Sequence, residues 1–263
     1  MKSFLEKHHI TPETRIIIAC SGGADSMFLL SEILKIHPKE NAVVAHFNHN
    51  LRWEESDRDE KFVQKFCEEN ELTFELWSAQ ISQIAKEKKL GIEEAARNER
   101  YNFLETIRKK HEAKYILTAH HLDDSIETFI FNLLRGTKLT GLSGINEKNG
   151  HILRPLLHIQ KSKILEACEK EKIKYVIDSS NVEETIQRNF IRQRITPLFS
   201  EINPNYPKAI DQLMTYFGDI QKHLNESALT ILKNDSFSVK DYETLPVFLQ
   251  KELLRHLFSQ MNS

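Results

Sequence analysis

Short apolar runs alternate with amphipathic stretches over the first two-thirds of the chain. Compact apolar runs bounded by polar residues are typical of strands buried on both faces, and apolar residues spaced three or four apart are typical of helices. On this pattern we predict strands at residues 16–19, 42–47, 72–77, 115–119 and 175–177. We predict the main helices between them at residues 27–34, 56–69, 92–107 and 125–134.

This alternation predicts an α/β fold. Repeated strand–helix units form a doubly wound parallel sheet, here of about five strands, with helices on both faces. Ligands of such sheets bind beyond the carboxyl ends of the strands. Polar segments lie at those ends, at residues 21–26, 46–49, 120–127 and 178–181, and we expect the chemistry there.

The pattern changes near residues 202–207, where Ile202-Asn203-Pro204-Asn205-Tyr206-Pro207 predicts a hinge. The residues after it favour helices, including a last apolar helix over residues 245–257. We therefore expect a catalytic domain over residues 1–202, followed by a small, mainly helical C-terminal region over residues 203–263.

Composition narrows the class of protein. The chain has 263 residues, 40% of them hydrophobic, and a net charge of −2. No apolar run approaches the roughly 20 residues that span a bilayer, and the start, MKSFLEKHHITPE, lacks the apolar core of a signal peptide. Cys20, Cys67 and Cys168 are widely spaced without a C-x-x-C pair, which argues against a disulfide framework or structural zinc. We expect a cytoplasmic protein that makes no membrane contact.

One basic patch stands out against the nearly neutral total charge. Residues 185–200 contain Arg188, Arg192 and Arg194 and no acidic residue. Arg188 and Arg192 share one helix face at a spacing of four residues. A solvated surface is the usual interpretation of such a pair, but without acidic neighbours contact with nucleic-acid phosphates is at least an equal alternative.

The turn after the first strand carries the most informative motif. It leads directly into an apolar helix and reads Ser21-Gly22-Gly23-Ala24-Asp25-Ser26. Unpaired N–H groups and the dipole at the helix start favour an anion, and paired glycines let a phosphate approach the backbone. Asp25 is suited to be a helix cap, a metal ligand or both. The alternative is an ordinary strand–helix turn with a common cap. The two commoner phosphate loops, G-x-G-x-x-G and G-x-x-x-x-G-K-[ST], are absent.

A second segment gathers acids and histidines after the fourth predicted strand. It reads His120-His121-Leu122-Asp123-Asp124-Ser125-Ile126-Glu127. If a helix begins near Asp123, Asp124 and Glu127 lie three apart on one face, where they could bind a metal, orient an amine or take a proton. The alternative is capping, with Asp123 or Asp124 as N-cap and Glu127 completing a capping box.

His46 and His49 also have a metal-like spacing. With a strand ending there and no cysteine nearby, a wall of an adenine pocket or a plain loop is favoured over zinc.

These motifs together resemble a known family. Residues 21–26 resemble the S-G-G-x-D-S pyrophosphate loop of the ATP-pyrophosphatases. His121, Asp124 and Glu127 resemble the H-x-x-D-x-x-E signature of the tRNA(Ile)-lysidine synthetase family. The similarity extends in order over about residues 15–200 and includes the segments 49–52, 93–101, 133–137, 153–157 and 178–192. Asn50 stands where glycine is usual, a mild departure because asparagine tolerates positive φ.

The resemblance implies an adenine nucleotide alpha hydrolase-like fold and an ATP-dependent ligase. ATP would bind with Mg²⁺ at the loop, with His46 beside the nucleotide and Asp25 as the metal ligand. The wobble cytidine of a tRNA(Ile) with a CAU anticodon would attack the α-phosphate and release pyrophosphate. Free L-lysine would then displace AMP and give lysidine. The ATP-binding residues of the loop would be Ser21, Gly22, Gly23, Ala24, Asp25 and Ser26.

The resemblance also implies roles for the other polar residues. Arg97 would clamp the reacting phosphate, and Asp124 and Glu127, with His121, would hold the lysine. The catalytic set would be Asp25, Arg97, Asp124 and Glu127. The tRNA would contact Arg135, Arg188, Arg192 and Arg194.

Two alternatives remain open. A tRNA thiolase of the same fold would need reactive or cluster-binding cysteines, which the scattered Cys residues do not supply. A nucleotide-binding regulator without chemistry would not need intact Asp25, Asp124 and Glu127. Longer members of the family carry further C-terminal domains that help to grip tRNA, so we expect this chain to be a short form or a fragment. The oligomeric state is left open, with a homodimer as one alternative.

Overall fold

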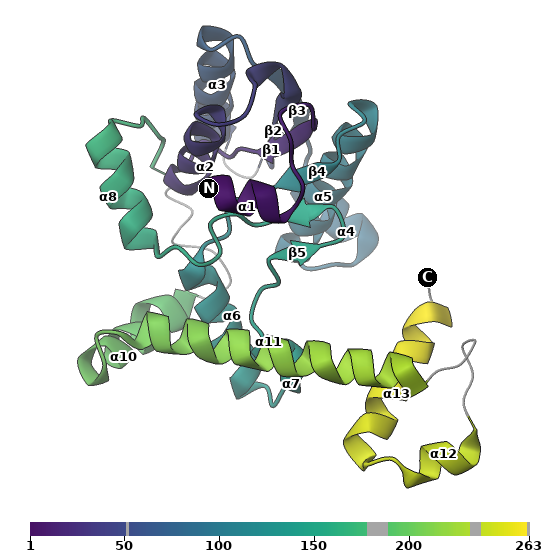
Figure 1. Cartoon of the computed structure of the whole chain (residues 1–263). Coiled ribbons are helices and arrows are strands. Elements are labelled where there is room, and N and C mark those ends of the chain that lie inside the picture. The colour runs from purple at the N-terminus through teal and green to yellow at the C-terminus, as the bar shows by residue number, and fades with distance from the viewer. Residues whose placement is uncertain (51–52, 178–188, 232–237, 262–263) are drawn as a thin grey trace. The chain divides into compact units, whose positions relative to one another are not determined.

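The computed structural model describes residues 1–50, 53–177, 189–231 and 238–261 (Figure 1). The chain falls into two compact units. The first, here called the sheet unit, comprises Met1–Thr128 and Ile145–Pro207. The second, here called the helical unit, comprises Phe129–Gly144 and Lys208–Ser263. The domain boundary expected between residues 202 and 203 stays a prediction.

Among the described residues, six strands form one sheet in the order β3-β2-β1-β4-β6-β5. All neighbours pair in parallel except β5, which is antiparallel to β6. The predicted α/β class with a mainly parallel sheet is therefore confirmed. The strands are β1 (Ile16–Ala19), β2 (Ala42–Asn48), β3 (Thr73–Ser78), β4 (Tyr115–Leu117), β5 (Lys148–Asn149) and β6 (Ile152–Leu153).

Helices connect the strands, and further helices come after the last strand in the chain. In the sheet unit they are α1 (Lys2–Lys7), α2 (Ala24–Leu34), η1 (Lys39–Asn41), α3 (Trp53–Glu69), α4 (Ile81–Lys88), α5 (Ile92–Lys110), the start of α6 (Leu122–Leu134), α8 (Lys161–Glu171), the π-helical η3 (Ile191–Ile195) and α10 (Thr196–Ile202). In the helical unit they are the end of α6, α7 (Leu139–Leu142), α11 (Tyr206–Ile231), α12 (Val239–Thr244) and α13 (Val247–Met261). No helix in the described part of the chain has both the length and the apolar character that crossing a bilayer requires.

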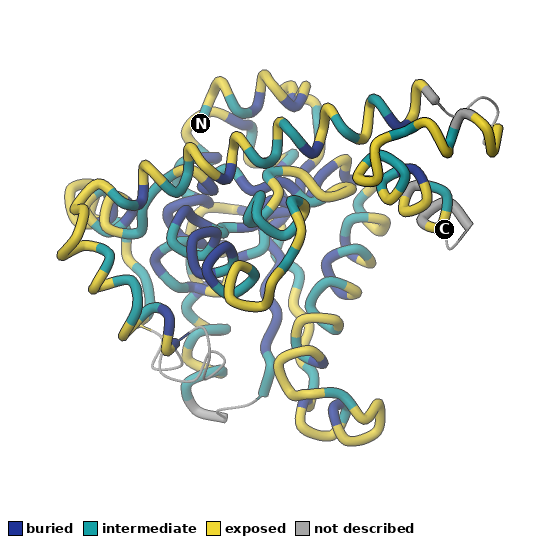
Figure 2. The backbone as a smooth tube through the Cα atoms, turned by 90° about the horizontal axis from the view of Figure 1, so that it is seen from below, coloured by how far each residue is buried: buried dark blue, intermediate teal, exposed yellow. Residues whose placement is uncertain are grey.

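The central strand β1 shows why its apolar run has no polar alternation. Ile16 and Ile18 pack into one core with α2, α3 and α8, and Ile17 packs into a second core with α4 and α5. All three side chains are fully buried. Successive side chains of a strand point to opposite faces, so a strand covered on both faces must be apolar at every position. Figure 2 shows buried backbone concentrated in the interior and exposed positions along the outer helices.

The fifth predicted strand is wrong. Residues Tyr175–Ile177 pair with no strand; instead the Val176 N–H donates a hydrogen bond of 2.9 Å to the Gly22 carbonyl oxygen. The sheet continues instead through β6 and β5, each only two residues long. Strands this short carry no recognisable apolar period, and the apolar run at 175–177 packs against the loop after β1.

The helical structure is interrupted where the hinge is predicted, because α10 ends at Ile202 and α11 begins at Tyr206, and the hinge itself stays a prediction. Within the helical unit, the buried Gln221 side chain joins three helices. Its Oε1 accepts from the Thr140 hydroxyl at 3.1 Å, and its Nε2 donates to Asn225 at 3.0 Å and to Glu252 at 3.2 Å. A buried amide with these partners fixes the register of α7, α11 and α13.

Candidate functional site

The loop after β1 is held by the hydroxyl of Ser26. Ser26 Oγ accepts hydrogen bonds from the backbone N–H groups of Ser21 and Gly22, both at 3.2 Å, and donates to the Gly23 carbonyl oxygen at 2.9 Å. Gly23 is the N-cap of α2, so the first N–H groups of the helix have no intrahelical acceptor. The closed loop therefore presents backbone donors at the positive end of a helix dipole, which suits a phosphate.

Gly22 is required by its surroundings. Its φ is +91°, and a Cβ at this position would lie 3.0 Å from Val176 Cγ2 and 3.2 Å from Val63 Cγ2. A side chain would be strained in conformation and crowded by both valines. The hydrogen bond from Val176 to Gly22 thus gives the misassigned segment a role in shaping the loop.

Asp25 lies in the first turn of α2 and forms an ion pair with Lys161. The Lys161 ammonium is 2.5 Å and 2.6 Å from the two carboxylate oxygens. The alternative that Asp25 caps the helix is wrong, because Gly23 is the N-cap and receives no side-chain cap. The carboxylate instead faces away from its own helix toward α8 and α6, where a cation already binds it.

His121 joins this loop to the acid-rich start of α6. Its Nε2 lies 3.7 Å from Asp25 and 3.6 Å from Asp124, and its Nδ1 lies 3.6 Å from Asp123. Burial lowers the pKa of His121, but the three carboxylates outweigh burial, so the pKa of His121 is raised. The structure thus brings the two sequence motifs together at the carboxyl ends of β1 and β4.

The capping alternative assigned the wrong residues, because neither Asp123 nor Asp124 is the N-cap of α6 and Glu127 completes no capping box. Because α6 begins at Leu122, Asp123 and Asp124 both lie in its first turn. Asp124 Oδ2 accepts from the His121 N–H at 3.0 Å, as the third helical residue of a capping box does. Asp123 accepts from the Lys161 N–H at 2.8 Å and so caps α8. Each contact occupies one carboxylate oxygen, and the other oxygen of Asp124 faces Arg192.

Glu127 is not a capping residue. Its side chain is 4% exposed, and its Oε1 and Oε2 accept from Nε and Nη2 of Arg192 at 2.7 Å and 3.1 Å. Arg192 Nη2 also lies 3.6 Å from Asp124. The sequence-based premise that Arg192 has no acidic neighbour is therefore wrong, because both acids come from a helix 65 residues away in the chain.

We expect a strong coupling between Arg192 and Glu127. Replacing Arg192 by Met removes a two-pronged guanidinium from a buried carboxylate, a change that costs more than losing an exposed pair. In a double-mutant cycle of Arg192→Met and Glu127→Gln, followed by urea unfolding, the coupling energy should be about 1–3 kcal/mol.

The exposed pair Lys163–Glu166 on α8, with side chains 65% and 68% exposed, is the matched control and should couple by less than about 0.5 kcal/mol. Equal coupling in the two cycles would contradict the buried contact.

The pKa values of the two adjacent histidines of the site are shifted in opposite directions. Burial, with the charges of Arg100, Arg154 and Arg97, lowers the pKa of His120 well below its usual value, so His120 is neutral. Its Nδ1 lies 3.0 Å from the Thr118 hydroxyl. Environments that push neighbouring pKa values apart are typical of acid–base sites.

His46 is buried at the end of β2, with its Nδ1 2.9 Å from the Cys20 carbonyl oxygen. Burial lowers the pKa of His46, so the ring is neutral and Nδ1–H is the donor. His49 contacts the Phe47 ring, with centroids 4.6 Å apart. Asn50 adopts φ +47°, which confirms that asparagine can replace the usual glycine there.

The remaining predicted residues make other contacts. Arg97 stacks over the Tyr101 ring at 5.2 Å, and Arg135 stacks over Phe131 at 5.1 Å within the helical unit. Arg194 is exposed on η3. Arg188 and the segment 178–181 lie outside the described residues. Among the described residues, no three side chains of His, Cys, Asp or Glu are arranged so that they could hold a metal ion by themselves.

Sequence reasoning missed Lys161. This lysine is the first residue of α8 and lies 136 positions from Asp25, its partner. It belongs to no motif of the sequence analysis, and nothing in the local pattern separates it from the other surface lysines. The only available signal was its place, a few residues after the Arg154-Pro155-Leu156-Leu157 stretch that leads away from β6.

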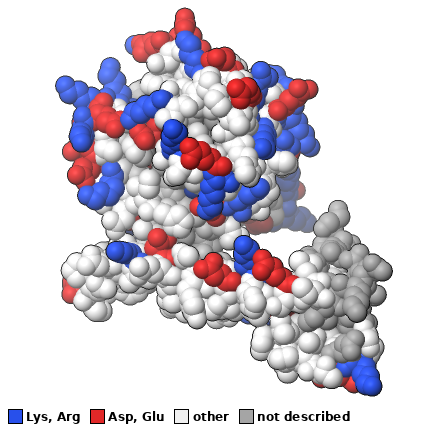
Figure 3. Space-filling model, in the orientation of Figure 1, with Lys and Arg blue, Asp and Glu red and all other residues white. Residues whose placement is uncertain are grey.

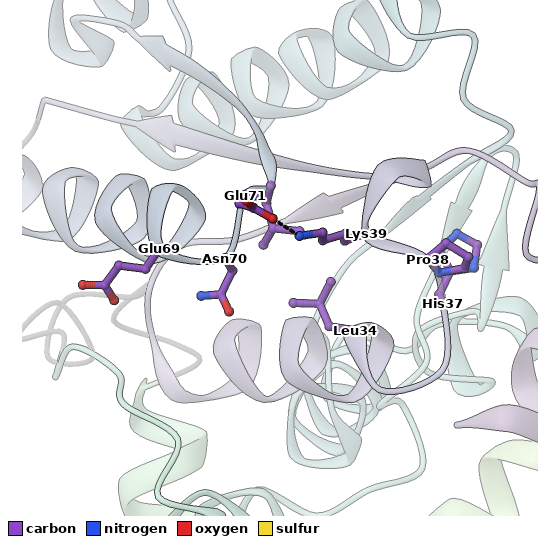
Figure 4. Close-up of a pocket in the computed structure, with 8 residues that line it drawn as sticks. Leu34, His37, Pro38, Lys39, Glu69, Asn70 and Glu71 are labelled. Carbon is purple, nitrogen blue, oxygen red and sulfur yellow. Dashed lines mark hydrogen bonds and ion pairs between the residues drawn. The ribbon is translucent and has the colours of Figure 1, made fainter.

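A surface pocket of about 520 Å³ lies elsewhere (Figure 4). It is lined by residues at the ends of α2 and α3 and before β2 and β3, including His37, Asn70 and an ion pair between Lys39 and Glu71. These segments lie at the amino ends of the strands, opposite the edge that carries the candidate site, so the pocket is not part of it. On the face in Figure 3, basic and acidic side chains are interspersed, in line with the nearly neutral total charge.

Comparisons with known proteins agree with these features. A family model described as a PP-loop domain matches residues 1–199. The chain is 40% identical over 224 residues to a tRNA(Ile)-lysidine synthase of Bacteroides thetaiotaomicron, covering 85% of this chain and 52% of that protein. It is 33% identical to the tRNA(Ile)-lysidine synthase of Bacillus subtilis, covering 100% of this chain and 60% of that protein. The chain therefore spans about half to three-fifths of the length of these curated relatives.

A solved structure shows the same fold at much lower identity. The U34-tRNA thiolase NcsA of Methanococcus maripaludis matches with a TM-score of 0.65 and 18% identity, over 82% of this chain and 76% of that chain. This likeness concerns the fold alone.

Proposed function

The chain belongs to the PP-loop domain family, and from this premise we propose that it is an ATP-dependent tRNA(Ile)-lysidine synthase. The reaction has two steps. The O2 atom of a wobble cytidine bonds to the α-phosphorus of ATP as the bond to pyrophosphate breaks. The ε-amine of free lysine then bonds to C2 of the activated base as AMP leaves and the amine loses a proton. The identity to curated lysidine synthases and the geometry of the site both support this assignment.

The loop supports the first step. Charge that develops on phosphate oxygens is stabilised by the unpaired N–H groups at the start of α2, and the Ser26 hydroxyl fixes the loop before that helix by accepting hydrogen bonds from Ser21 and Gly22. Asp25 would hold Mg²⁺ together with phosphate oxygens, as magnesium sites in phosphoryl transfer often do with one carboxylate. Its carboxylate already binds the cationic Lys161 ammonium, so its surroundings accept a positive charge. The ion would neutralise the leaving pyrophosphate.

The start of α6 supports the second step. Free lysine carries one carboxylate and two ammonium groups. Asp124 and Glu127 offer negative charge to an ammonium, and Arg192, which binds Glu127 and lies beside Asp124, adds positive charge near the carboxylate of a bound lysine. The carboxylates of Asp124 and Glu127 are the candidates to take the proton that the amine loses.

One observation carries the proposal. His121 Nε2 lies 3.7 Å from Asp25 and 3.6 Å from Asp124, so the nucleotide loop and the acidic helix face one another across a single imidazole. Two substrates held on these elements would meet, which is the requirement for joining them.

The test measures AMP release from ATP with a tRNA(Ile) transcript bearing a CAU anticodon. Release of AMP and formation of lysidine should require both lysine and the transcript. A transcript with uridine at the wobble position is the matched control and should give no product. Release of AMP that needs the transcript but is indifferent to lysine would contradict the proposal.

The thiolase alternative is not favoured. Burial raises the pKa of Cys20 to about 11 and the pKa of Cys67 to about 12, and burial also raises the pKa of Cys168. All three are buried thiols, which are poor nucleophiles near neutral pH. Free cysteines of this kind also suit the reducing cytoplasm, where the reaction would take place.

Contact with the tRNA would involve exposed arginines. Arg194 is the member of the basic patch that the structure describes as exposed, so it is the better candidate there. Arg192 is better assigned to the lysine site, because it already binds Glu127. Arg135 and Arg188 stay proposals from the family resemblance.

A further inference from the structure

A cluster of three arginines surrounds one tyrosine near the proposed site. Arg97 and Arg100 lie in the first half of α5, with guanidinium carbons 5.2 Å and 5.3 Å from the centre of the Tyr101 ring. Arg154 directly follows β6 and is 4% exposed. Burial raises the pKa of Tyr101, but the charges of Arg100, Arg97 and Arg154 outweigh it and lower the pKa of Tyr101. We call these four residues the arginine cluster.

Two buried polar atoms of the arginine cluster have no well-formed hydrogen bond. Arg154 donates from Nη1 to the Asn146 carbonyl oxygen at 2.6 Å. Its buried Nε and the buried Tyr101 hydroxyl make no hydrogen bond of good geometry within the described ranges of the chain, although Arg154 lies close enough to that hydroxyl to help lower the pKa of Tyr101. Buried polar groups are nearly always hydrogen-bonded, so a donor pair of this kind indicates a ligand atom that accepts from it.

The positive charge of the arginine cluster is not compensated. In the part of the chain that the structure describes, no ion pair joins a carboxylate to Arg97, Arg100 or Arg154, whereas Arg108 on the same helix is bound by Glu105 at 2.7 Å. Neighbouring guanidiniums repel one another, so a nearby anion would stabilise this arrangement. Guanidinium groups bind phosphate through two parallel hydrogen bonds, which makes phosphate the fitting anion.

Two substrates of the proposed reaction carry phosphate, ATP and the tRNA, and the position of the arginine cluster on the sheet favours the tRNA. The loop that would bind ATP follows β1, and the arginine cluster lies at the carboxyl ends of β4 and β6 and at the start of α5. Strands are spaced about 4.8 Å apart, so β6 is roughly 10 Å from β1 along this edge. Arg97 is exposed and Arg100 is half-buried, so a large ligand can reach both.

Resting on the proposed function, we propose that the arginine cluster binds a backbone phosphate of the RNA strand that carries the reacting cytidine. The phosphate oxygens accept hydrogen bonds from Arg100, from Arg154 Nε and from the Tyr101 hydroxyl, with Arg97 at the exposed rim. Such a contact positions the strand without reading its sequence. It holds the base near the loop while β1 and α2 bind the nucleotide.

The test compares Arg100→Gln with the control Lys109→Gln, which removes the same charge from an exposed position of α5. Dissociation constants of tRNA(Ile) and of an unrelated tRNA are measured by filter binding from low to high KCl, without ATP or lysine. ATP binding is measured separately by equilibrium dialysis without RNA. Arg100→Lys, which keeps the charge, checks for loss of packing.

Arg100→Gln should weaken binding of both tRNAs about tenfold at low salt and reduce the salt slope by about 0.7–0.9, as expected for one lost phosphate contact. The dissociation constant of ATP should stay within about twofold. Lys109→Gln should change the affinity for neither tRNA nor ATP, and Arg100→Lys should keep most of the salt slope. Unchanged RNA binding by Arg100→Gln would overturn the inference, and weakened ATP binding with normal RNA binding would assign the cluster to the nucleotide. These assays measure binding and not product. The RNA-binding proposal can therefore be refuted while lysidine still forms, and it can be supported even if no lysidine forms.

Discussion

Replacing Asp25 by Asn should lower the rate of AMP release by a factor of at least about 100, while the protein still folds. The side chain is 27% exposed and makes no cap to its own helix, so the loss of its charge should not unfold α2. The amide can no longer bind a divalent cation beside the leaving pyrophosphate. The rate should therefore fall at the adenylation step, before lysine is used.

Because Asp25 forms an ion pair with Lys161, a variant of Lys161 can separate two roles of Asp25, binding a metal ion and holding Lys161. If Asp25 acted only by holding Lys161, then Lys161→Met would lower the rate as much as Asp25→Asn does. If Asp25 binds the metal, Lys161→Met should be much milder, because the carboxylate remains. The control is Glu32→Gln, which removes a charge from the same helix at a residue that pairs with Lys35.

The measurement is AMP release with saturating tRNA and lysine across a magnesium titration, with circular dichroism to confirm folding. A rate for Asp25→Asn equal to that of the unmodified protein would remove Asp25 from the mechanism and leave it a structural partner of Lys161.

The second large effect is expected for lysine. Asp124→Asn and Glu127→Gln keep size and much hydrogen bonding but lose charge, and each removes a charge-assisted contact of about 1.5–3 kcal/mol. The KM for lysine should rise at least about tenfold in each variant, whereas the KM for ATP should change little. Glu127→Gln should have the larger effect, because its side chain is 4% exposed and that of Asp124 is 26% exposed.

Asp124→Asn and Glu127→Gln should also change which form of the tRNA accumulates. Adenylation of the cytidine should survive, so adenylated tRNA should build up when lysine is limiting. The competing view is that the two acids bind magnesium, in which case the KM for ATP would rise first. Measuring both KM values on both variants decides between the views, and an increase confined to ATP would refute the lysine site.

Local pattern was enough for most of the fold and for half of the site. The buried strands at 16–19 and 115–117 are apolar throughout, and the strand at 42–48 is apolar over its first four residues, because both faces are covered; this requirement is visible in sequence. The residues of the loop after β1 are adjacent in sequence, and a glycine at φ +91° leaves a clear mark. Asp124 and Glu127 are three residues apart, so helical geometry alone puts them on one face.

Tertiary structure decided everything that depends on partners distant in the chain. The apolar run at 175–177 supports Gly22 instead of joining the sheet, and two strands of two residues take the sheet edge. Lys161 and Arg192 find their carboxylates 136 and 65 positions away. The sequence around a charged residue does not indicate which oppositely charged residue it will pair with, because ion pairs form wherever the packed backbone brings the two groups within reach. Apolar periodicity reports only which face of an element is buried, and the pairing of charges at the sheet edge is settled afterwards by topology.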